Sequence, residues 1–200
     1  MTSAPIEPQP SPARRADAER NRARILAVAR AALAADETAQ VSMAEIARRA
    51  GVGMATLYRN FPGRRELLEA LYTDEVDALC ADAAAIGGET PGAAFVAWLR
   101  RFVAFFTSKR RVAAELLDQT GDGNPVFGES RARVLAAGQP LLVAAQRSNE
   151  VRADLSIAQV MDLIGAVAAI PGDTGYIEPI LQAAIAGLRP PGRDDDGLER

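Results

Sequence analysis

Residues 42–63 constrain the fold most, because they carry signals for two short helices joined by a tight turn. Ser42 and Glu45 match a capping box, in which the serine hydroxyl accepts from the amide three residues on and the glutamate reaches back. Gly51 suits the left-handed backbone that often ends a helix, and Pro62 stops the helix that follows. The stretch therefore predicts helices at about residues 42–50 and 54–61.

The sizes of the side chains in this stretch indicate that the two helices cross closely. A close crossing needs a small residue on the first helix, a glycine in the turn and apolar side chains facing inward. Ala47 and Gly51 meet the first two needs, and Leu57 and Phe61, four residues apart, share the inward face of the second helix. The outward residues of that helix are then predicted to be Met54, Ala55, Thr56, Tyr58, Arg59 and Asn60.

Apolar residues recur at helical spacing along the rest of the chain, and no run alternates in the pattern of a strand. Further helices are predicted at about residues 17–35, 64–85, 91–108, 110–119, 125–148, 156–169 and 175–188. The predicted fold class is all-α. The pattern predicts an N-terminal three-helix domain with a helix-turn-helix at residues 17–65, which the observations below indicate to be a DNA-binding domain, and a larger helical domain at residues 66–188. The proline-rich, basic arm (1–16) and the tail (189–200) are predicted to be disordered.

Charge is divided unevenly along the chain, although the net charge is only −3. Residues 1–65 hold 11 arginines against 6 acidic residues, whereas residues 66–200 hold 12 basic residues against 20 acidic ones. A basic segment at one end of an acidic protein indicates nucleic-acid binding confined to that end. Arginines that merely solvate a surface helix are the alternative explanation of the same composition.

The residues needed for most catalytic and metal chemistry are scarce. The chain has no histidine and one cysteine, Cys80, so any general base would be a carboxylate and any metal site would rely on oxygen ligands. We therefore expect no enzymatic activity, no cofactor and no metal site. A lone cysteine cannot form an internal disulfide, and residues 1–12 are polar and unlike a signal peptide. We accordingly expect a cytoplasmic protein without membrane association.

The stretch from Ser42 to Leu68, SMAEIARRAGVGMATLYRNFPGRRELL, resembles the helix-turn-helix of the TetR/AcrR family of bacterial transcriptional regulators. The matching pattern is a capped helix, Ile46-Ala47, Ala50-Gly51-Val52, Thr56-Leu57-Tyr58, Phe61, a basic residue at 64 or 65, and Leu67. Two positions depart from the family pattern. Gly53 stands where a serine-type residue usually caps the second helix, and Ala55 replaces a common glycine, which should weaken the cap without changing how the helix docks.

The resemblance implies that the second short helix enters the major groove of DNA. Thr56 and Tyr58 fall where family members contact DNA, and Arg64 or Arg65 falls where a basic residue meets a phosphate. The arginines before the first helix resemble a flexible basic arm. For Tyr58 the alternative is packing against the first helix. The predicted DNA-binding residues are Ser42, Met54, Ala55, Thr56, Tyr58, Arg59, Asn60 and Arg64, with hydrogen bonds to bases expected from Arg59 and Asn60.

The second half of the chain is larger than DNA binding alone requires, and the resemblance implies that it binds an effector and forms a homodimer. The helices at 156–169 and 175–188 combine large apolar residues with small ones that allow close approach, so they are the predicted dimer interface. Their alternative role is core. An aromatic stripe predicts a ligand cavity, although such a stripe is also typical of core. The predicted ligand-binding residues are Trp98, Phe102, Phe105 and Met161.

These predictions combine into one hypothesis about function. The chain is a ligand-responsive DNA-binding transcriptional regulator, a homodimeric repressor that a small-molecule effector releases from a palindromic double-stranded DNA operator. The effector would act by shifting the helix at 64–85, which joins the DNA reader to the second domain. The alternative is a constitutive DNA-binding or architectural protein without an effector.

Overall fold

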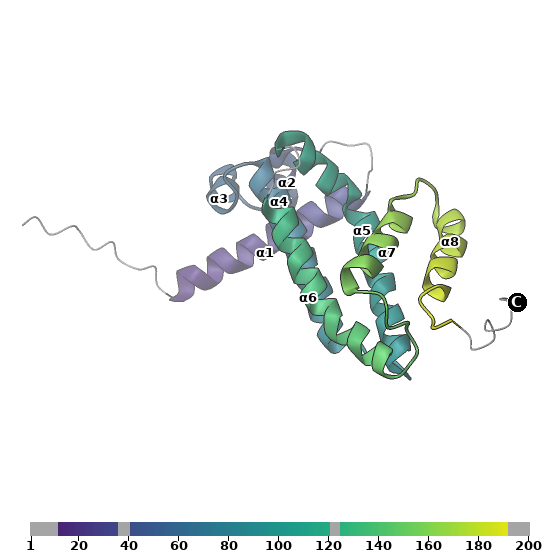
Figure 1. Ribbon diagram of the computed structural model, residues 1–200. Coiled ribbons are helices and arrows are strands. Elements are labelled where there is room, and N and C mark those ends of the chain that lie inside the picture. Colours follow the sequence, from purple (N-terminus) through teal and green to yellow (C-terminus); the bar gives the residue numbers. More distant parts are fainter. Residues whose placement is uncertain (1–11, 36–40, 121–124, 192–200) are drawn as a thin grey trace, which may run out of the picture. The chain divides into compact units, whose positions relative to one another are not determined.

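The computed structural model describes residues 12–35, 41–120 and 125–191, and every regular element in these ranges is a helix (Figure 1). The all-α fold class is therefore confirmed. The elements are α1 (Pro12–Ala35), α2 (Met43–Ala50), α3 (Met54–Asn60), α4 (Arg64–Ala85), α5 (Pro91–Thr120), α6 (Pro125–Arg147), α7 (Ile157–Ala169) and α8 (Thr174–Ala186). The predictions for residues 1–11 and 192–200 lie outside the described residues.

Helix α1 begins earlier than the sequence predicted, at Pro12 rather than at Asp17. The predicted disordered arm includes residues 12–16, and this part of the prediction is wrong, because these residues are helical. Proline is well tolerated in the first turn of a helix, because its missing N–H has no partner within the helix there. Alanine and arginine, which fill the next four positions, are strong helix formers. The side chains of Arg14 and Arg15 lie outside the described part of the chain.

Helix α5 covers both of the ranges, 91–108 and 110–119, that the sequence divides at Lys109. Lys109 is buried, and its ammonium group lies 3.2 Å from a carboxylate oxygen of Glu75 on α4. A buried charge is tolerated when it is paired in this way. The ion pair therefore lets the helix continue through a position that looks like a surface break in the sequence.

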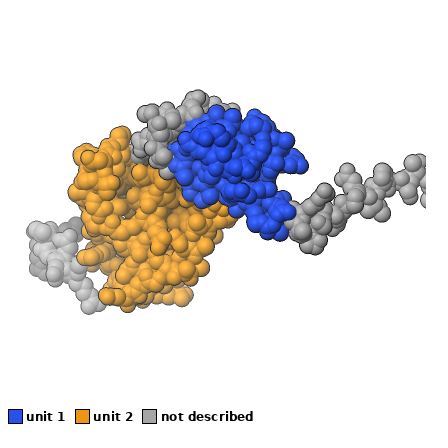
Figure 2. Space-filling model, turned by 180° about the vertical axis from the view of Figure 1, so that it is seen from behind, with its two compact units in different colours: residues 1–71 blue, residues 72–200 orange. Residues whose placement is uncertain are grey.

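Contacts within the chain define two compact units, residues 1–71 and residues 72–200 (Figure 2). The division falls inside α4, a few residues beyond the predicted boundary at 65. In the first unit α1 packs on α2 and α3, and α2 packs on α3. The core of this unit is aliphatic with a single aromatic residue, and its most buried large members are Ile25, Ile46, Leu57, Phe61, Leu67, Leu68 and Leu71.

The second unit is centred on Trp98 of α5, which is completely buried. Helix α5 packs on α6 and α7, and α7 also packs on α8. The indole nitrogen of Trp98 donates to the carbonyl of Leu79, 3.2 Å away, so the polar atom of this side chain is satisfied in the core. Gly138 of α6 lies against the ring: a β-carbon there would stand only 2.4 Å from it. Close packing of α6 on α5 therefore requires glycine at this position.

The described residues were searched for helices that could span a membrane and for groups of side chains that could bind a metal ion. None of their helices combines the length and the apolar character that a membrane crossing requires. Likewise, these ranges contain no group of three or more histidine, cysteine, aspartate or glutamate side chains placed to hold a metal ion.

Candidate functional site

Ser42 begins α2 as predicted. Its hydroxyl accepts from the amide of Glu45 at 3.2 Å, which satisfies one of the unpaired donors of the first turn. The predicted return bond from Glu45 is wrong, because its carboxylate binds Arg48 and Arg49 at 2.6–2.8 Å. The hydrogen bond from Arg48, followed by that from Arg49, lowers the pKa of Glu45 to about 2. Charge-assisted bonds to the two guanidinium groups are stronger than a bond to a neutral amide.

The turn between α2 and α3 depends on Gly51. This residue has φ 63° and ψ 34°, the left-handed conformation that a β-carbon would strain. Its N–H donates to the carbonyls of Ala47 and Arg48, and the N–H of Val52 donates to Ala47 at 3.0 Å. These bonds close the end of α2 and turn the chain sharply. As expected from the sequence, Gly53 precedes α3 without a side-chain cap.

Helix α3 presents the two faces that its spacing predicted. Leu57 and Phe61 are buried, whereas Tyr58 is 46% exposed and Met54 is 39% exposed. Ala55 is exposed as well. The exposure of Tyr58 disfavours the alternative in which it packs against α1. The outward face is thus largely neutral and accessible.

Two of the predicted base-reading residues bond to their own helix. A guanidinium nitrogen of Arg59 lies 3.0 Å from the hydroxyl of Thr56, and the amide nitrogen of Asn60 lies 2.8 Å from the carbonyl of Thr56. Arg59 is exposed, so it can exchange this bond for one to DNA. Asn60 is half-buried and completes the last turn of α3. Arg59 is therefore better placed than Asn60 to meet a base.

Arg22 of α1 holds the end of α3, a role that the sequence did not reveal. Its guanidinium carbon lies 4.6 Å from the centre of the Phe61 ring, within the range of a cation–π contact. One guanidinium nitrogen also lies 3.4 Å from the carbonyl oxygen of Asn60. The contact joins residues 38 positions apart, so no local pattern could have predicted it.

The two arginines at the start of α4 are in different surroundings. Arg64 is half-buried, and its guanidinium donates to the carbonyl of Val41, the residue before the Ser42 cap. Arg65 is exposed and lies 3.3 Å from Glu66 and 3.7 Å from Glu69. Arg64 therefore ties the start of α4 to the start of α2. The phosphate contact predicted for one of the two suits the more exposed Arg65.

A cavity of about 140 Å³ lies among α4, α5, α6 and α7, within the second unit. Three of the four predicted ligand-binding residues line it: Phe102 and Phe105 from α5, and Met161 from α7. The rest of the lining, which the sequence analysis did not single out, is Tyr72, Val76, Phe106, Phe127, Ser130, Arg131, Val134 and Leu135.

Trp98, the fourth predicted ligand-binding residue, does not line this cavity. Its ring is completely buried, bonded to Leu79 and pressed against Gly138. It lies one turn before Phe102 on the same face of α5, as its spacing predicted, but it belongs to the core and not to the lining of this cavity. Of these aromatic residues of α5, Trp98 therefore belongs to the core, whereas Phe102 and Phe105 line the cavity.

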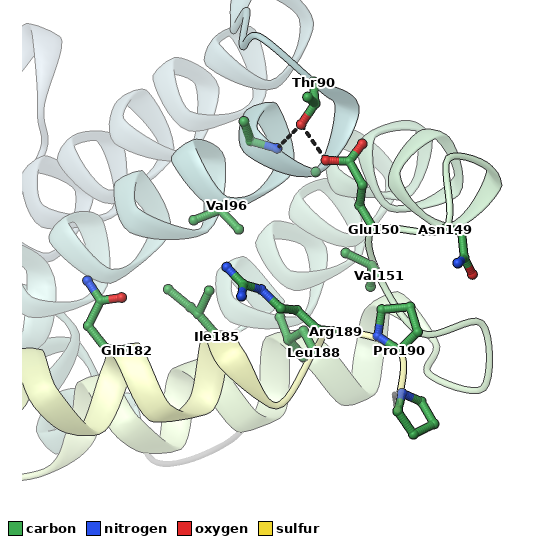
Figure 3. Close-up of a pocket in the computed structure, with 13 residues that line it drawn as sticks. Thr90, Val96, Asn149, Glu150, Val151, Gln182, Ile185, Leu188, Arg189 and Pro190 are labelled. Carbon is green, nitrogen blue, oxygen red and sulfur yellow. Dashed lines mark hydrogen bonds between the residues drawn. The ribbon is translucent and has the colours of Figure 1, made fainter. Parts of the chain in front are cut away.

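A larger groove, of about 1160 Å³, lies elsewhere in the second unit and contains none of the predicted ligand-binding residues (Figure 3). It runs between the start of α5, the turn at 149–151 and the end of α8. Figure 3 shows the Thr90 hydroxyl beside the carboxylate of Glu150, to which it donates. The same hydroxyl accepts from the amide of Ala93 at 3.2 Å. Its lining has no aromatic ring. The smaller aromatic cavity is therefore the better candidate for a compact organic ligand, although it is not the largest space.

Helices α7 and α8 have one buried face and one exposed apolar face. Ile164 and Leu181 are among the buried residues, which accounts for the core role left open by the sequence. On the other side Leu163 is 42% exposed and Tyr176 is 61% exposed. Small and apolar exposed neighbours at helical spacing extend this face: Ala166, Pro179, Ala183 and Ala186. The two helices thus serve the core and also leave an apolar surface uncovered.

Two family models match the chain, and together they span most of it. Residues 25–71 match the model of bacterial regulatory proteins of the tetR family. Residues 90–190 match a model described as the C-terminal domain of SbtR-like transcriptional regulators. A comparison with curated proteins found no match.

Solved structures similar to the chain agree with these models. A TetR transcriptional regulator from Streptomyces coelicolor is 34% identical, with a TM-score of 0.69 over 86% of this chain and 99% of that one. A TetR transcription regulatory protein from Mycobacterium vanbaalenii is 35% identical, with a TM-score of 0.70 over 88% and 98%. RolR, solved with resorcinol, shares the fold at 21% identity and a TM-score of 0.57 over 86% and 89%. With its helix-turn-helix in α2 and α3, the chain therefore belongs to the TetR family of bacterial transcriptional regulators.

Proposed function

We propose that the chain is a ligand-responsive repressor, which binds a palindromic operator as a homodimer and leaves it when a small-molecule effector binds. The observation that carries this proposal is the presence, in one chain, of an exposed α3 face and a separate aromatic cavity. An architectural DNA-binding protein would need the first feature and not the second.

The neutral outward face of α3 suits a helix that lies deep in the major groove. Ala55 adds no bulk, and its methyl group can contact the methyl group of thymine. The hydroxyls of Thr56 and Tyr58 can donate to phosphates, which accept from neutral donors as well as from cations. Positive charge comes from the surrounding arginines of the first unit, among them Arg22 and Arg65. In this arrangement Arg59 is the side chain with the reach and the donors to read a base.

The apolar face of α7 and α8 supports dimerisation through these helices. Large apolar side chains such as Leu163 and Tyr176 are exposed on these two helices, and apolar residues gathered on one face are typical of a surface that binds a partner. Two copies related by a two-fold axis would cover Leu163 and Tyr176 of each chain in a four-helix interface. A symmetric dimer would present two copies of α3 to successive major grooves, about 34–36 Å apart, on a palindromic site.

Helix α4 is proposed to couple the cavity to the helix-turn-helix. Tyr72 and Val76 of this helix line the cavity, while Arg64 at its start bonds to Val41 beside α2. A ligand that displaces Tyr72 therefore acts on the helix that also holds the start of α2. RolR, solved with resorcinol, is a protein of the same fold with a small aromatic ligand. To change the ratio of operator-bound to released protein from 99:1 to 1:99, a ligand must bind the released conformation about 5.5 kcal/mol more tightly than the operator-bound one.

Footprinting of the chain on the DNA upstream of its own gene tests the proposal. The expected result is protection of two half-sites arranged as a palindrome, with no protection of the flanking DNA. Smooth protection along the whole fragment would instead support the architectural protein. The matched variants are Tyr58→Phe, which keeps the ring and should retain part of the protection, and Tyr58→Ala, which should abolish it while leaving the dimer intact.

A further inference from the structure

The aromatic cavity is small for a ligand site. Its volume of about 140 Å³ is well below the roughly 300–1,000 Å³ of sites that hold drug-sized ligands. An apolar protein cavity of about 150 Å³ is known to hold benzene. A ligand that lies wholly inside this volume is therefore about the size of one six-membered ring with a small substituent.

The walls of the cavity favour an aromatic ring over an aliphatic chain of the same volume. Five of the lining side chains are aromatic: Tyr72, Phe102, Phe105, Phe106 and Phe127. The ring centroid of Tyr72 lies 5.2 Å from that of Phe127, edge to face, and 5.7 Å from that of Phe105 in a tilted arrangement. Such walls present both ring faces and ring edges. An aromatic ligand gains from these contacts beyond the area that it buries.

The polar groups of the lining favour a neutral hydroxyl over a charge. The Arg131 guanidinium at the lining already lies 2.9 Å from the carboxylate of Asp162, so the two charges are matched and leave no net charge for an ionic ligand to pair with. A carboxylate would have to leave water for walls that are mostly aromatic, which is costly. Ser130 is buried in the lining, and a hydroxyl oxygen can accept two hydrogen bonds. It can therefore accept a bond from a ligand hydroxyl.

We propose that the ligand class of this cavity is a neutral single-ring phenol, whose ring lies among the phenylalanines and whose hydroxyl donates to Ser130. The release of operator by such a ligand rests on the proposed function. Its binding to the cavity does not, because binding can be measured without DNA.

Calorimetric titration of the full-length chain with four probes tests the proposal. Phenol should bind, and benzene should bind about tenfold more weakly, because it lacks the one hydrogen bond. Benzoate has the same ring with a charge, and naphthalene has two fused rings, so both should bind far more weakly than phenol. The proposal is overturned if phenol does not bind at millimolar concentration, or if naphthalene or benzoate binds more tightly than phenol.

Two serine variants locate the hydroxyl contact. Ser130→Ala should lower the affinity for phenol about tenfold and leave the affinity for benzene unchanged. Ser108→Ala is the matched control, because Ser108 is an exposed residue of α5 that does not line the cavity. Its hydroxyl donates to the carbonyl of Phe105, 3.0 Å away. Ser108→Ala should change neither affinity. Equal losses for phenol in both variants would overturn the assignment of Ser130.

A third variant tests the cavity itself. Val134→Ile adds one methylene group to the lining, and this group can occupy part of the cavity volume that a ligand would fill. It should weaken phenol and benzene together, since both need the same volume. Unchanged binding of both probes would place them outside this cavity and overturn the proposal.

The failure of the ligand class and the failure of the proposed function give different results. If phenol binds and does not release operator DNA, the ligand class stands and the release mechanism is wrong. If phenol does not bind while the chain still protects a palindrome, the ligand class is wrong and operator recognition stands.

Discussion

Replacing Gly138 by alanine should destabilise the second unit although alanine is the better helix former. The added β-carbon would lie 2.4 Å and 2.5 Å from two ring carbons of Trp98, and 3.1 Å from a methyl carbon of Ile157. Contacts below 3 Å require one of the groups to move. The ring has little room, because it is completely buried and its nitrogen is bonded to Leu79.

The size of this effect follows from two opposing terms. Overpacking a well-packed core costs about 1–3 kcal/mol, and the fixed ring puts Gly138→Ala near the upper end. Alanine returns about 1 kcal/mol of helix propensity. The free energy of unfolding should therefore fall by about 2 kcal/mol. For a chain of this size that corresponds to a decrease in Tm of roughly 4–8 °C.

Gly128→Ala is the matched control, because Gly128 is on the same helix and a β-carbon there would meet nothing within 4 Å. This variant should be more stable than the wild type by up to about 1 kcal/mol. Urea unfolding at one fixed chain concentration measures both variants. A Gly138→Ala variant as stable as Gly128→Ala would show that the Trp98 ring does not oppose a β-carbon at position 138. In a Trp98→Phe background the cost of Gly138→Ala should shrink, since the two sites are in contact.

Three further predictions follow from other contacts. Arg22→Ala should weaken operator binding with the fold retained, because the substitution frees the end of α3. Arg24→Ala is the control, since the guanidinium of Arg24 bonds within α1, to Asn21 at 3.0 Å. Mobility-shift titration should show a larger loss of operator affinity for Arg22→Ala than for Arg24→Ala. Glu150→Gln should lower Tm at neutral pH and have little effect in strong acid. Hydrogen bonds from the Thr90 hydroxyl and then from Ser148 lower the pKa of the Glu150 carboxyl in the folded chain. The ionised carboxylate therefore stabilises the fold above its pKa in the unfolded chain, and this stabilisation is lost as pH falls through its pKa in the folded chain. An equal loss of Tm at both pH values would contradict this pH dependence. Leu163→Asp should convert the dimer to a folded monomer in sedimentation experiments, and a persisting dimer would exclude this face from the interface.

The α2–turn–α3 segment was predictable because its signals are local. Ser42, Gly51 and Pro62 each act on the backbone within a few residues, so the helix boundaries follow from sequence alone. The inward position of Leu57 and Phe61 follows equally from their spacing. The Arg22 contact with Phe61 was not predictable, since it depends on how α1 packs across α3.

The aromatic cavity was predictable only in part, because helical spacing gives the face of a residue and not its depth. Trp98, Phe102 and Phe105 share one face of α5, yet only the last two reach the cavity. What separates them is Gly138 on α6, which lets that helix close over the Trp98 ring. Similarly, the continuity of α5 depends on the pairing of Lys109 with Glu75 on another helix. Both features depend on contacts between different helices, so the local sequence pattern does not reveal them.

The ratio of operator affinity to random-DNA affinity, measured at one physiological salt concentration, shows whether α3 reads the sequence of operator DNA. Specific protein–DNA complexes are typically 10³-fold or more tighter than non-specific ones. If α3 reads the operator, the ratio should be at least about 10³ for the wild type. It should fall toward 1 for Tyr58→Ala, with the dimer and the weak non-specific binding retained. A wild-type ratio near 1, or a Tyr58→Ala variant that keeps the full ratio, would contradict the assignment of the exposed α3 face as the reader of operator DNA.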